Sequence, residues 1–451
     1  MIPLITLIGK FIHFVSYLFN IGSGGTWPGE IVLQLKPDIF SFFVSQLNKG
    51  LIIVAGTNGK TTTAKMIRQI IGKRVILNQS GANLLNGLVS AFIEKASLTG
   101  KIDADFAVLE VDENTLPQVL STACIKNIKN KKLIVVLLNL FRDQLDRYGE
   151  VDIIANKWKK VLERLPSDST VILNADDPQI AYLGKDLKSK VVYFGIDRPE
   201  RFLPKIEHAT DSTYCHICGG KLTYKGIYFS HLGIWFCENC GNSRPKPDVE
   251  NYSSALVGLY NEYNTLAAVS VGRELGIKEK MIKTSLASFT PAFGRQEEFE
   301  IGNKKIKMFL SKNPAGFNAS LRTVLDLKPK SLLLVLNDRI PDGRDVSWIW
   351  DTDFEMIPKA VSTIVSGDRV YDMGLRIKYT LNKSQIFPRL RPGQANLKSQ
   401  NHGSKLKIYE SLKEAIDAGL NEISEGETLY ILSTYSAMLE VRKILTGRKI
   451  L

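Results

Sequence analysis

The stretch Leu51–Thr62, LIIVAGTNGKTT, decides the fold of this chain of 451 residues. Its first five residues, LIIVA, form a short run of bulky apolar side chains, which is typical of a strand buried on both faces. Residues 61–71 follow with apolar side chains at helical spacing. A glycine-rich turn between such a strand and a helix is the setting in which backbone N–H groups bind phosphate. The stretch therefore predicts an α/β fold with a phosphate loop.

The residues of this loop suit the binding of ATP. The N-terminus of the following helix adds positive potential, and Lys60 can reach the outer phosphates. The Thr61 hydroxyl can hold a magnesium ion. The loop is shorter than the usual GxxxxGK[ST] pattern, so a glycine turn with an incidental lysine is the alternative, but the strand–loop–helix context favours a phosphate site. The nucleotide-binding residues predicted in the loop are Gly56, Thr57, Asn58, Gly59, Lys60, Thr61 and Thr62.

Short apolar runs alternate with helical stretches on both sides of the loop. This alternation predicts a parallel sheet covered on both faces by helices. We divide the chain into an N-terminal helix and turn-rich segment (1–45), an ATP-binding α/β domain (46–295) and a C-terminal Rossmann-like α/β domain (296–451). Further strands are predicted at 107–111, 133–138, 170–173, 191–194, 332–336, 363–365 and 429–432, a helix near 436–445 and a long loop at 388–407.

The composition is that of a folded globular protein, with 44% apolar and 23% charged residues. The net charge of +13 favours an anionic partner, and nucleic acid, a membrane surface and a phosphate-rich substrate all qualify. Residues 1–19 are strongly apolar but interrupted by Lys10 and His13. They predict a packed or interfacial helix. A spanning helix would have about 20 residues with almost no charge, and a signal peptide would have its charge at the front and a small-residue cleavage site behind. We expect a cytoplasmic protein, with contact at the inner face of the cell membrane left open.

Four of the five cysteines form two CxxC pairs separated by eighteen residues, inside a segment (208–249) that interrupts the α/β rhythm. Four thiolates at this spacing are typical of a closed, structural zinc site. We expect His216 and His231 to be surface residues, because four thiols are the better ligands. Cys124 is interpreted as a small apolar filler. The predicted zinc ligands are Cys215, Cys218, Cys237 and Cys240.

The segment GTNGKTTT (56–63) resembles the ATP-binding loop of the Mur ligases and folylpolyglutamate synthases. The resemblance implies that Glu110, in LEVDE, holds magnesium together with Thr61. It also implies that Asn261 and Asn264 lie beside the nucleotide, and that Arg295 reaches the phosphates from the domain junction.

Two further matches to the family are imperfect. NLFRDQLD (139–146) resembles the family's N-x-x-x-D-H-L-D motif, but Gln144 stands where a histidine is usual, so no catalytic role is assigned to it. Lys157 resembles a lysine that is carbamylated in several relatives, with a spacing one residue short. In these ligases ATP phosphorylates a carboxylate and a nitrogen nucleophile then displaces phosphate, so the protein mainly positions the groups and neutralises charge.

Over nearly its whole length the chain resembles the MurT family, the ligase subunits of lipid II isoglutaminyl synthases. The resemblance rests on GGTWPGEIVLQLKPD (24–38), the cysteine ribbon and DGRDVSWIWDTDFE (342–355), among other segments. It implies ATP-dependent amidation of the D-glutamate α-carboxylate in the lipid II stem peptide, with ammonia from a GatD-like glutaminase partner. It further implies that Asp345 orients the partner's catalytic histidine. The alternative for Asp345 is a turn or helix cap.

Two other functions are weighed against this one. A ligase that adds an amino acid would share the ATP site, although the ribbon and the DGRDVSWIWD segment argue against it. A zinc-ribbon nucleic-acid-binding ATPase would explain the basic charge. However, the ribbon itself (214–242) has few Arg or Lys residues and no basic stripe, so no nucleic-acid partner is predicted.

Overall fold

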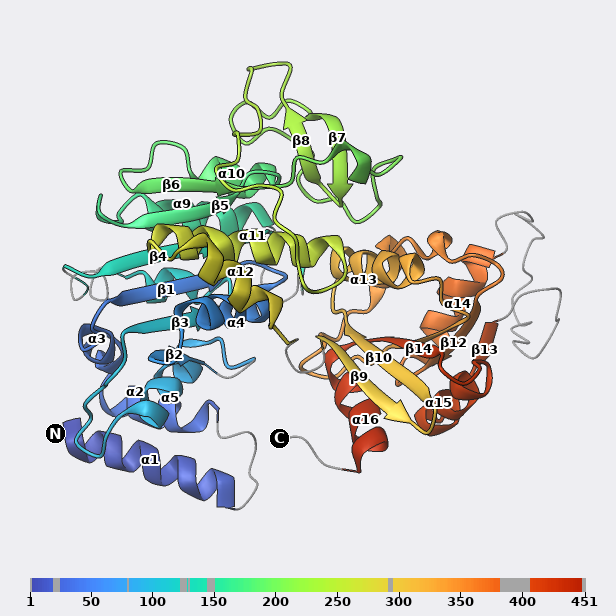
Figure 1. The fold of residues 1–451 in the computed structure, drawn as a ribbon, viewed down its shortest axis with the longest axis horizontal. Coiled ribbons are helices and arrows are strands. Elements are labelled where there is room, and N and C mark those ends of the chain that lie inside the picture. The colour runs from blue at the N-terminus through green and yellow to red at the C-terminus, as the bar shows by residue number, and fades with distance from the viewer. Residues whose placement is uncertain are drawn as a thin grey trace. The chain divides into compact units, whose positions relative to one another are not determined.

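The computed structural model describes residues 2–18, 25–78, 81–121, 128, 130–143, 151–290, 295–381 and 406–447. The chain forms two compact units, Met1–Thr290 and Pro291–Ile450 (Figure 1). Each unit is built on a six-stranded sheet, which confirms the predicted α/β fold class. Cys124, Gln144 and nearly all of the predicted loop 388–407 lie outside the described residues.

Unit 1 has a parallel sheet in the order β2-β3-β1-β4-β5-β6. The central strand β1 pairs with β3 on one side and β4 on the other, so its backbone groups are satisfied within the sheet. Its side chains alternate: Leu51 and Ile53 join the core beneath one face, while Ile52 and Val54 point to the other. The strands are β1 (Gly50–Ala55), β2 (Val75–Leu77), β3 (Phe106–Glu110), β4 (Lys132–Leu137), β5 (Thr170–Asn174) and β6 (Lys190–Phe194).

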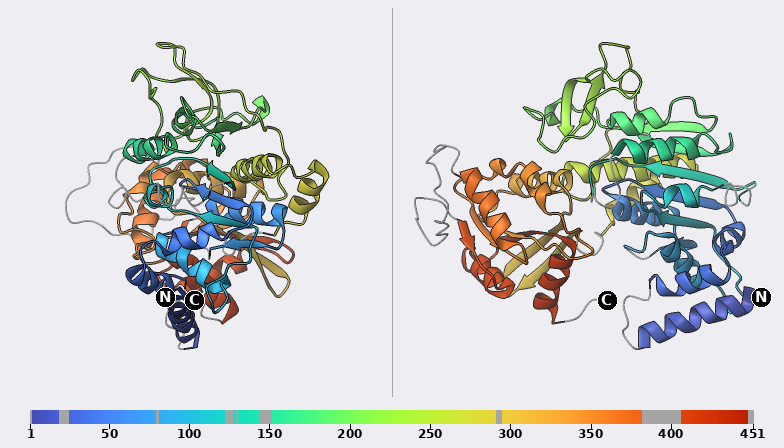
Figure 2. Two further views of the ribbon diagram at one scale, coloured as in Figure 1. Left: turned by 90° about the vertical axis from the view of Figure 1, so that its left-hand side faces the viewer. Right: turned by 180° about the vertical axis from the view of Figure 1, so that it is seen from behind.

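Helices cover both faces of this sheet (Figures 1 and 2). On one face α4 packs against α11 and α12, and on the other α3, α5 and α9 contribute to the large core. This double cover explains why the strands read as continuous apolar runs in the sequence. The helices are α4 (Lys60–Ile71), α5 (Leu85–Lys95), α6 (Leu116–Val119), α9 (Val151–Leu162), α10 (Pro178–Leu183), η1 (Pro199–Arg201), α11 (Leu259–Glu274) and α12 (Glu279–Ala287).

The N-terminal segment belongs to the core of unit 1. Its helices are α1 (Ile2–Leu18), α2 (Trp27–Leu35) and α3 (Ile39–Ser45). Ile5, Val32 and Phe43 lie in the same apolar cluster as the sheet, and the Phe43 ring stacks on Phe92 at 5.7 Å between centroids. No helix among the described residues is long and apolar enough to cross a membrane.

The four-cysteine segment is an insertion between β6 and α11, and its hairpin stands outside the β6 edge of the sheet (Figures 1 and 2). The hairpin strands are β7 (Thr223–Phe229) and β8 (Leu232–Phe236). A buried network anchors the insertion: Asp176 accepts hydrogen bonds from Arg244 Nε at 2.6 Å and from Tyr263 Oη at 2.7 Å. Burial raises the pKa of the Asp176 carboxyl, whereas the Arg244 guanidinium opposes this shift.

Unit 2 has a mixed sheet in the order β13-β12-β11-β14-β10-β9. The strands are β9 (Arg295–Ile301), β10 (Lys304–Leu310), β11 (Ser331–Val335), β12 (Ser362–Ser366), β13 (Leu406–Ile408) and β14 (Thr428–Ser433). The helices are α13 (Pro314–Asp326), η2 (Ser347–Asp351), η3 (Phe354–Met356), α14 (Val370–Leu381), α15 (Leu412–Asn421) and α16 (Tyr435–Thr446).

The antiparallel hairpin β9–β10 was not predicted from the sequence. Both strands carry many Glu and Lys residues. This composition suits β9 in particular, because β9 is the edge strand and most of its residues are partly or fully exposed. The prediction of a loop through Lys407 is wrong at its end, because Leu406 and Lys407 belong to β13, which pairs with β12.

Candidate active site

The phosphate loop joins β1 to α4 and depends on two glycines with positive φ. Gly56 has φ +137° and Gly59 has φ +92°, a region that side chains rarely adopt. A Cβ atom on Gly59 would also lie 2.1 Å from Asn264 Oδ1. Glycine is therefore required at position 59 both by the backbone conformation and by the close approach of α11.

Lys60, at the first position of α4, is buried against the loop. Its Nζ donates to Gly56 O at 2.5 Å and to Thr57 O at 3.3 Å, and it forms a buried salt bridge with Glu113 Oε1 at 3.2 Å. Trp158 Nε1 donates to Glu113 O at 2.8 Å and so holds that segment in place. Sequence reasoning missed Glu113, although it follows Glu110 by three residues in LEVDEN, where a second carboxylate near the loop could have been noted.

Thr61 and Glu110, the two residues predicted to hold magnesium, meet beside the loop. Thr61 Oγ1 donates to Glu110 Oε2 at 2.6 Å, and both residues are buried. Glu110 lies at the carboxyl end of β3, where Asn78 Oδ1 accepts from its backbone N–H at 2.9 Å. A hydroxyl and a carboxylate are hard oxygen donors, so the pair suits magnesium bound between protein and phosphate.

Asn139 supports the other side of the loop. Its Oδ1 accepts from Asn58 N at 2.8 Å, its Nδ2 donates to Asn58 O at 3.0 Å, and its backbone O accepts from Thr57 N at 3.0 Å. The Thr57 hydroxyl accepts from Phe141 N at 3.0 Å. The NLFRD segment (139–143) therefore shapes the phosphate loop through its first residues. This role of Asn139 was not predicted from the sequence.

The two asparagines of α11 lie together near the loop. Asn264 Nδ2 donates to Asn261 Oδ1 at 3.2 Å, and Thr63 Oγ1 donates to Asn264 Oδ1 at 3.3 Å. Both asparagines are buried. Arg295 is the first residue of β9 in unit 2, and its side chain lies outside the described part of the structure. Its reach to the phosphates stays a prediction.

His231 is not a surface residue, contrary to expectation. It is fully buried at the hairpin turn of the ribbon, with its ring 4.9 Å from that of Phe141 and Nε2 3.4 Å from Asp177 Oδ2. The same Asp177 oxygen accepts from Leu140 N at 2.9 Å. The ribbon thus contacts the 139–141 segment that supports the phosphate loop. A single sequence could not show this contact, because residue 231 is distant from residue 140 along the chain.

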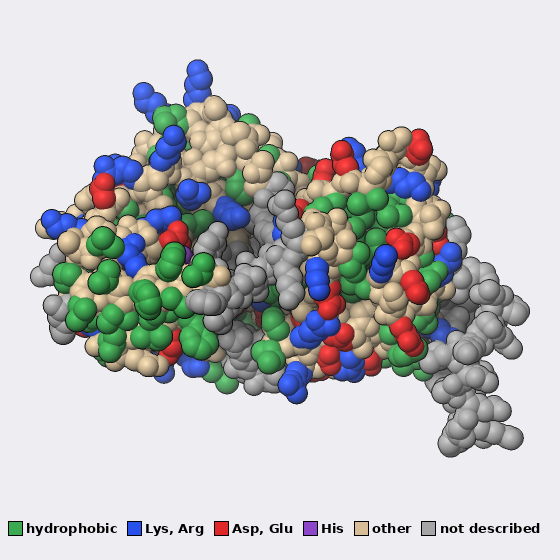
Figure 3. All heavy atoms as spheres, turned by 90° about the horizontal axis from the view of Figure 1, so that it is seen from below, with side chains coloured by type: hydrophobic (Ala, Val, Ile, Leu, Met, Phe, Trp, Pro, Cys, Tyr) green, Lys and Arg blue, Asp and Glu red, His purple; other side chains and the backbone are tan. Residues whose placement is uncertain are grey.

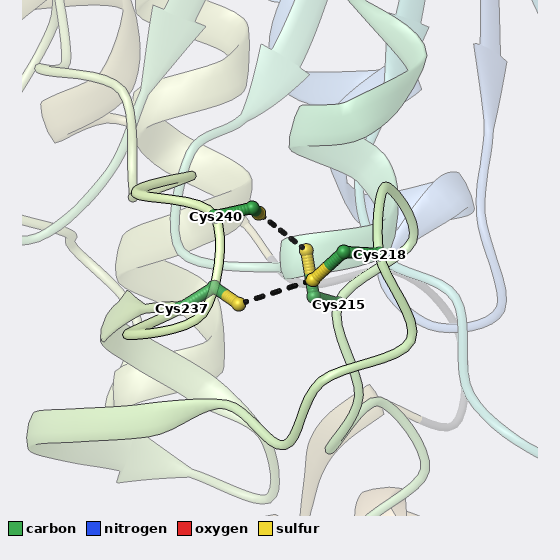
Figure 4. A group of neighbouring side chains, drawn as sticks. All are labelled: Cys215, Cys218, Cys237 and Cys240. Atoms are coloured by element: carbon green, nitrogen blue, oxygen red, sulfur yellow. Dashed lines mark hydrogen bonds between the residues drawn. The ribbon is translucent and has the colours of Figure 1, made fainter.

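The four cysteines converge on one point (Figure 4). Their sulfur atoms all lie within 4.8 Å of one another, with Cys215–Cys240 at 3.6 Å and Cys218–Cys237 at 3.5 Å. Tetrahedral zinc with Zn–S bonds of about 2.3 Å requires sulfurs roughly 3.8 Å apart, so the geometry fits. Hydrogen bonds from Asn239 and from the Gly220 N–H lower the pKa of Cys218. His216 is partly buried and stacks on Tyr182 instead.

In unit 2 the Asp345 side chain is exposed and accepts from Ser347 N at 2.8 Å, just before η2. This contact matches the alternative interpretation of a turn cap, yet it leaves the carboxylate accessible. Trp350, in the same segment, is 49% exposed and lies over the Arg376 guanidinium at 5.7 Å. Trp348 packs against Phe317. Trp350 is thus the more exposed of the two tryptophans.

The fold and the phosphate site define the class of the protein, and comparison with known proteins agrees. The Mur ligase middle domain matches residues 54–272, and the MurT ligase C-terminal family matches residues 310–438. The structure is similar to a pseudomurein peptide ligase type C from Methanothermus fervidus (TM-score 0.61, 25% identity, 91% of this chain and 80% of that one). It also shares the fold of MurF from Thermotoga maritima in complex with ADP (TM-score 0.58, 15% identity, 92% and 83%).

The protein is therefore an ATP-dependent ligase of the Mur type, and its site suits ATP with magnesium. Among curated relatives, the MurT subunit of Streptococcus pneumoniae R6 lipid II isoglutaminyl synthase is 33% identical, with 98% of this chain and 97% of the relative covered. The corresponding subunit of Staphylococcus aureus COL is 35% identical, with 79% and 84% covered. The chain belongs to the MurT family.

Proposed function

We propose that this protein is the synthetase subunit of a lipid II isoglutaminyl synthase. It would use ATP to amidate the D-glutamate α-carboxylate of the lipid II stem peptide, giving D-isoglutamine during peptidoglycan biosynthesis. The observation that carries the proposal is the 33% identity to a MurT subunit over 98% of the chain, which includes both units. The reaction is consistent with the ATP site, because a carboxylate must be activated before ammonia can replace its oxygen.

The residues of unit 1 suit the activation step. ATP transfers its terminal phosphoryl group to the carboxylate, and ammonia then displaces phosphate from the acyl phosphate. Lys60 would exchange its contacts with Glu113 and the loop carbonyls for the phosphate oxygens. Thr61 and Glu110 would hold a magnesium ion, which would neutralise phosphate charge. Catalysis then consists mainly of positioning and charge stabilisation.

Ammonia would come from a GatD-like glutaminase partner that binds unit 2. Asp345 offers an accessible carboxylate, and a carboxylate can hold the imidazole of a partner's catalytic histidine in one tautomer. Trp350 is exposed close by in the sequence, and tryptophan is enriched at protein interfaces. The two residues therefore support a partner surface around η2.

We further propose that the four cysteines bind one structural zinc ion. A closed set of four thiolates leaves no open coordination position for chemistry. In that role the metal would hold the hairpin whose turn carries His231 to Asp177.

The test is a reconstituted amidation reaction. The purified chain would be incubated with ATP, magnesium and lipid II, with and without the glutaminase partner, and the stem peptide followed by mass spectrometry. We expect the stem peptide to lose the mass that corresponds to replacing a hydroxyl by an amino group. Glutamine should serve as the nitrogen donor only when the partner is present, and ammonium should serve as the donor without the partner. A product heavier by an amino-acid residue would instead establish a peptide-forming ligase, the activity named for the Methanothermus fervidus relative.

A further inference from the structure

Helix α1 exposes an unbroken apolar stripe. Five of its side chains are about half or more exposed: Leu4 (62%), Leu7 (48%), Phe11 (66%), Phe14 (59%) and Leu18 (61%). At helical spacing these positions fall within an arc of about 80°. Figure 3 shows hydrophobic side chains gathered on the surface at the side where α1 lies. The stripe contains no charged residue over the length of the helix.

The opposite face of α1 holds the helix on unit 1. Ile5 and Ser16 are buried, and a Cβ on Gly9 would lie 3.0 Å from both Ile93 and Val32. Unit 1 therefore covers one face of the helix and leaves the apolar stripe exposed. Contiguous exposed apolar patches of several hundred Å² mark interaction sites. The exposed stripe is thus a candidate binding surface.

We propose that α1 lies flat on an anionic lipid bilayer, with the stripe inserted at the boundary between headgroups and acyl chains. Because Ile5 and Gly9 pack against unit 1, α1 is held on that unit and can meet a bilayer only with its exposed face, which fits an interfacial position. The net charge of +13 is complementary to anionic lipid. Lys10 lies at the flank of the stripe, although Glu94 is close to it.

A neighbouring loop packs against α1 and carries a further exposed apolar side chain. Gly100 contacts the first turn of α1 at Ile2 and Thr6, and this loop carries Leu98, which is 66% exposed. Lys95 and Lys101 flank Leu98 and are exposed, and Lys95 forms a salt bridge with Glu94 at 2.7 Å. An apolar side chain between lysines suits a lipid surface, where the cations meet phosphate headgroups.

A bilayer fits the stripe better than a second copy of the chain. The five side chains alone offer roughly 600 Å² of surface, less than the about 800 Å² per partner that a stable protein interface buries, so a second copy would need further contacts around the stripe. The choice of a bilayer also rests on the proposed function, because a lipid-linked substrate would bring the ligase to the membrane. Interfacial helices of this kind need no pocket, only apolar area and favourable charge.

The test is co-sedimentation of the full chain with vesicles that contain no lipid II. One set would contain equal parts phosphatidylglycerol and phosphatidylcholine, and the other phosphatidylcholine alone. We expect the wild type to bind the anionic vesicles more strongly than the neutral ones. The double variant Phe11→Ser/Phe14→Ser should bind them roughly tenfold more weakly. The control Met281→Ser/Ile340→Ser changes side chains that are 58% and 81% exposed elsewhere, and should bind as the wild type does.

The proposal would be overturned if the wild type did not bind anionic vesicles, or if the Phe11→Ser/Phe14→Ser variant bound them equally well. A wild-type dimer in analytical ultracentrifugation that the double variant converts to monomer would assign the stripe to a second copy. Thermal unfolding midpoints equal to that of the wild type would show that each variant is folded. The vesicles lack lipid II and ATP, so the result of the co-sedimentation experiment does not depend on whether the protein catalyses amidation.

Discussion

At the scale of single residues, Lys60 carries a buried charge balanced by Glu113. We predict that Lys60→Ala lowers ATP-dependent amidation at least about 100-fold, because about 3 kcal/mol of phosphate stabilisation is lost. The variant should also unfold more easily, since breaking a buried pair costs about 3–5 kcal/mol. Adding Glu113→Gln should restore stability but not activity. Lys188→Ala, at an exposed lysine, is the control. Near-normal turnover in Lys60→Ala would remove the lysine from the phosphate site.

Asp345 is the residue whose role depends on the partner. We predict that Asp345→Asn abolishes most glutamine-dependent amidation by the complex, with a loss of about 100-fold or more. Ammonium-dependent amidation by the same variant should stay normal, because the ATP site lies in unit 1. The nearby Asp351→Asn is the matched control. An equal loss with both nitrogen donors would show instead that Asp345 supports the fold or the ligase chemistry.

At the scale of elements, the ribbon links the four-cysteine cluster to the segment that supports the phosphate loop. We predict that elemental analysis finds one zinc per chain. Chelation of this zinc should expose four reactive thiols and weaken ATP binding.

The His231→Leu variant should keep the zinc but raise the KM for ATP about tenfold, which corresponds to about 1.4 kcal/mol. The reason is that Asp177, which accepts a hydrogen bond from Leu140 N, loses its contact with His231. Lys221→Ala, at an exposed ribbon residue, is the control. An unchanged KM in His231→Leu would limit the ribbon to a structural role.

A second link joins the DGRD segment to the start of α16. Asp342 Oδ1 accepts from Ser436 N at 2.8 Å, and its other oxygen accepts from the Ser436 hydroxyl. Burial raises the pKa of Asp342 above its ordinary value of 3.8, so the folded state binds the proton more tightly than the unfolded state does. The contribution of this group to stability is therefore complete below pH 3.8 and decreases as pH rises through the raised pKa.

We predict that the free energy of unfolding of the wild type, relative to that of Asp342→Asn, decreases from pH 4 toward neutral pH and then levels off. Urea denaturation at a series of pH values measures this difference. Asp417→Asn, at an exposed position in the same unit, should show no such trend. A difference that grows with pH would mean that the Ser436 contacts, and not burial, dominate the pKa of Asp342.

At the scale of the whole molecule, the described residues of each unit form apolar clusters of their own, among them a large one around β1 in unit 1 and those on the faces of the unit 2 sheet. We predict two thermal transitions in calorimetry. ATP with magnesium should raise the transition temperature of unit 1, because the phosphate loop lies there. At 100 times the Kd the free energy of unfolding of this unit should increase by about 2.7 kcal/mol. Lys60→Ala/Glu113→Gln should abolish this shift. A single transition that shifts as a whole would show that the units unfold together.

Local patterns in the sequence predicted most of the helices and strands of the fold. The strand–loop–helix at Leu51–Ile71 and the paired cysteines are specified by neighbouring residues, since strand periodicity, glycine turns and ligand spacing operate over short distances. The Thr61–Glu110 pair joins residues that are distant along the chain, and Glu110 was predicted because LEVDE resembles a segment of the Mur ligase family. The β9–β10 hairpin was not, because an edge hairpin rich in Glu and Lys lacks the apolar run that marks a buried strand.

What the sequence by itself determined is the class of fold, the phosphate loop and the cysteine cluster, because each is encoded within a short segment. Only the tertiary structure decided that Glu113 pairs with Lys60, that His231 is buried against Asp177, and that one apolar face of α1 is left uncovered. These features depend on which distant surfaces meet. A pattern of apolar residues indicates that a face prefers burial, whereas the packing of the rest of the chain determines whether that face is covered.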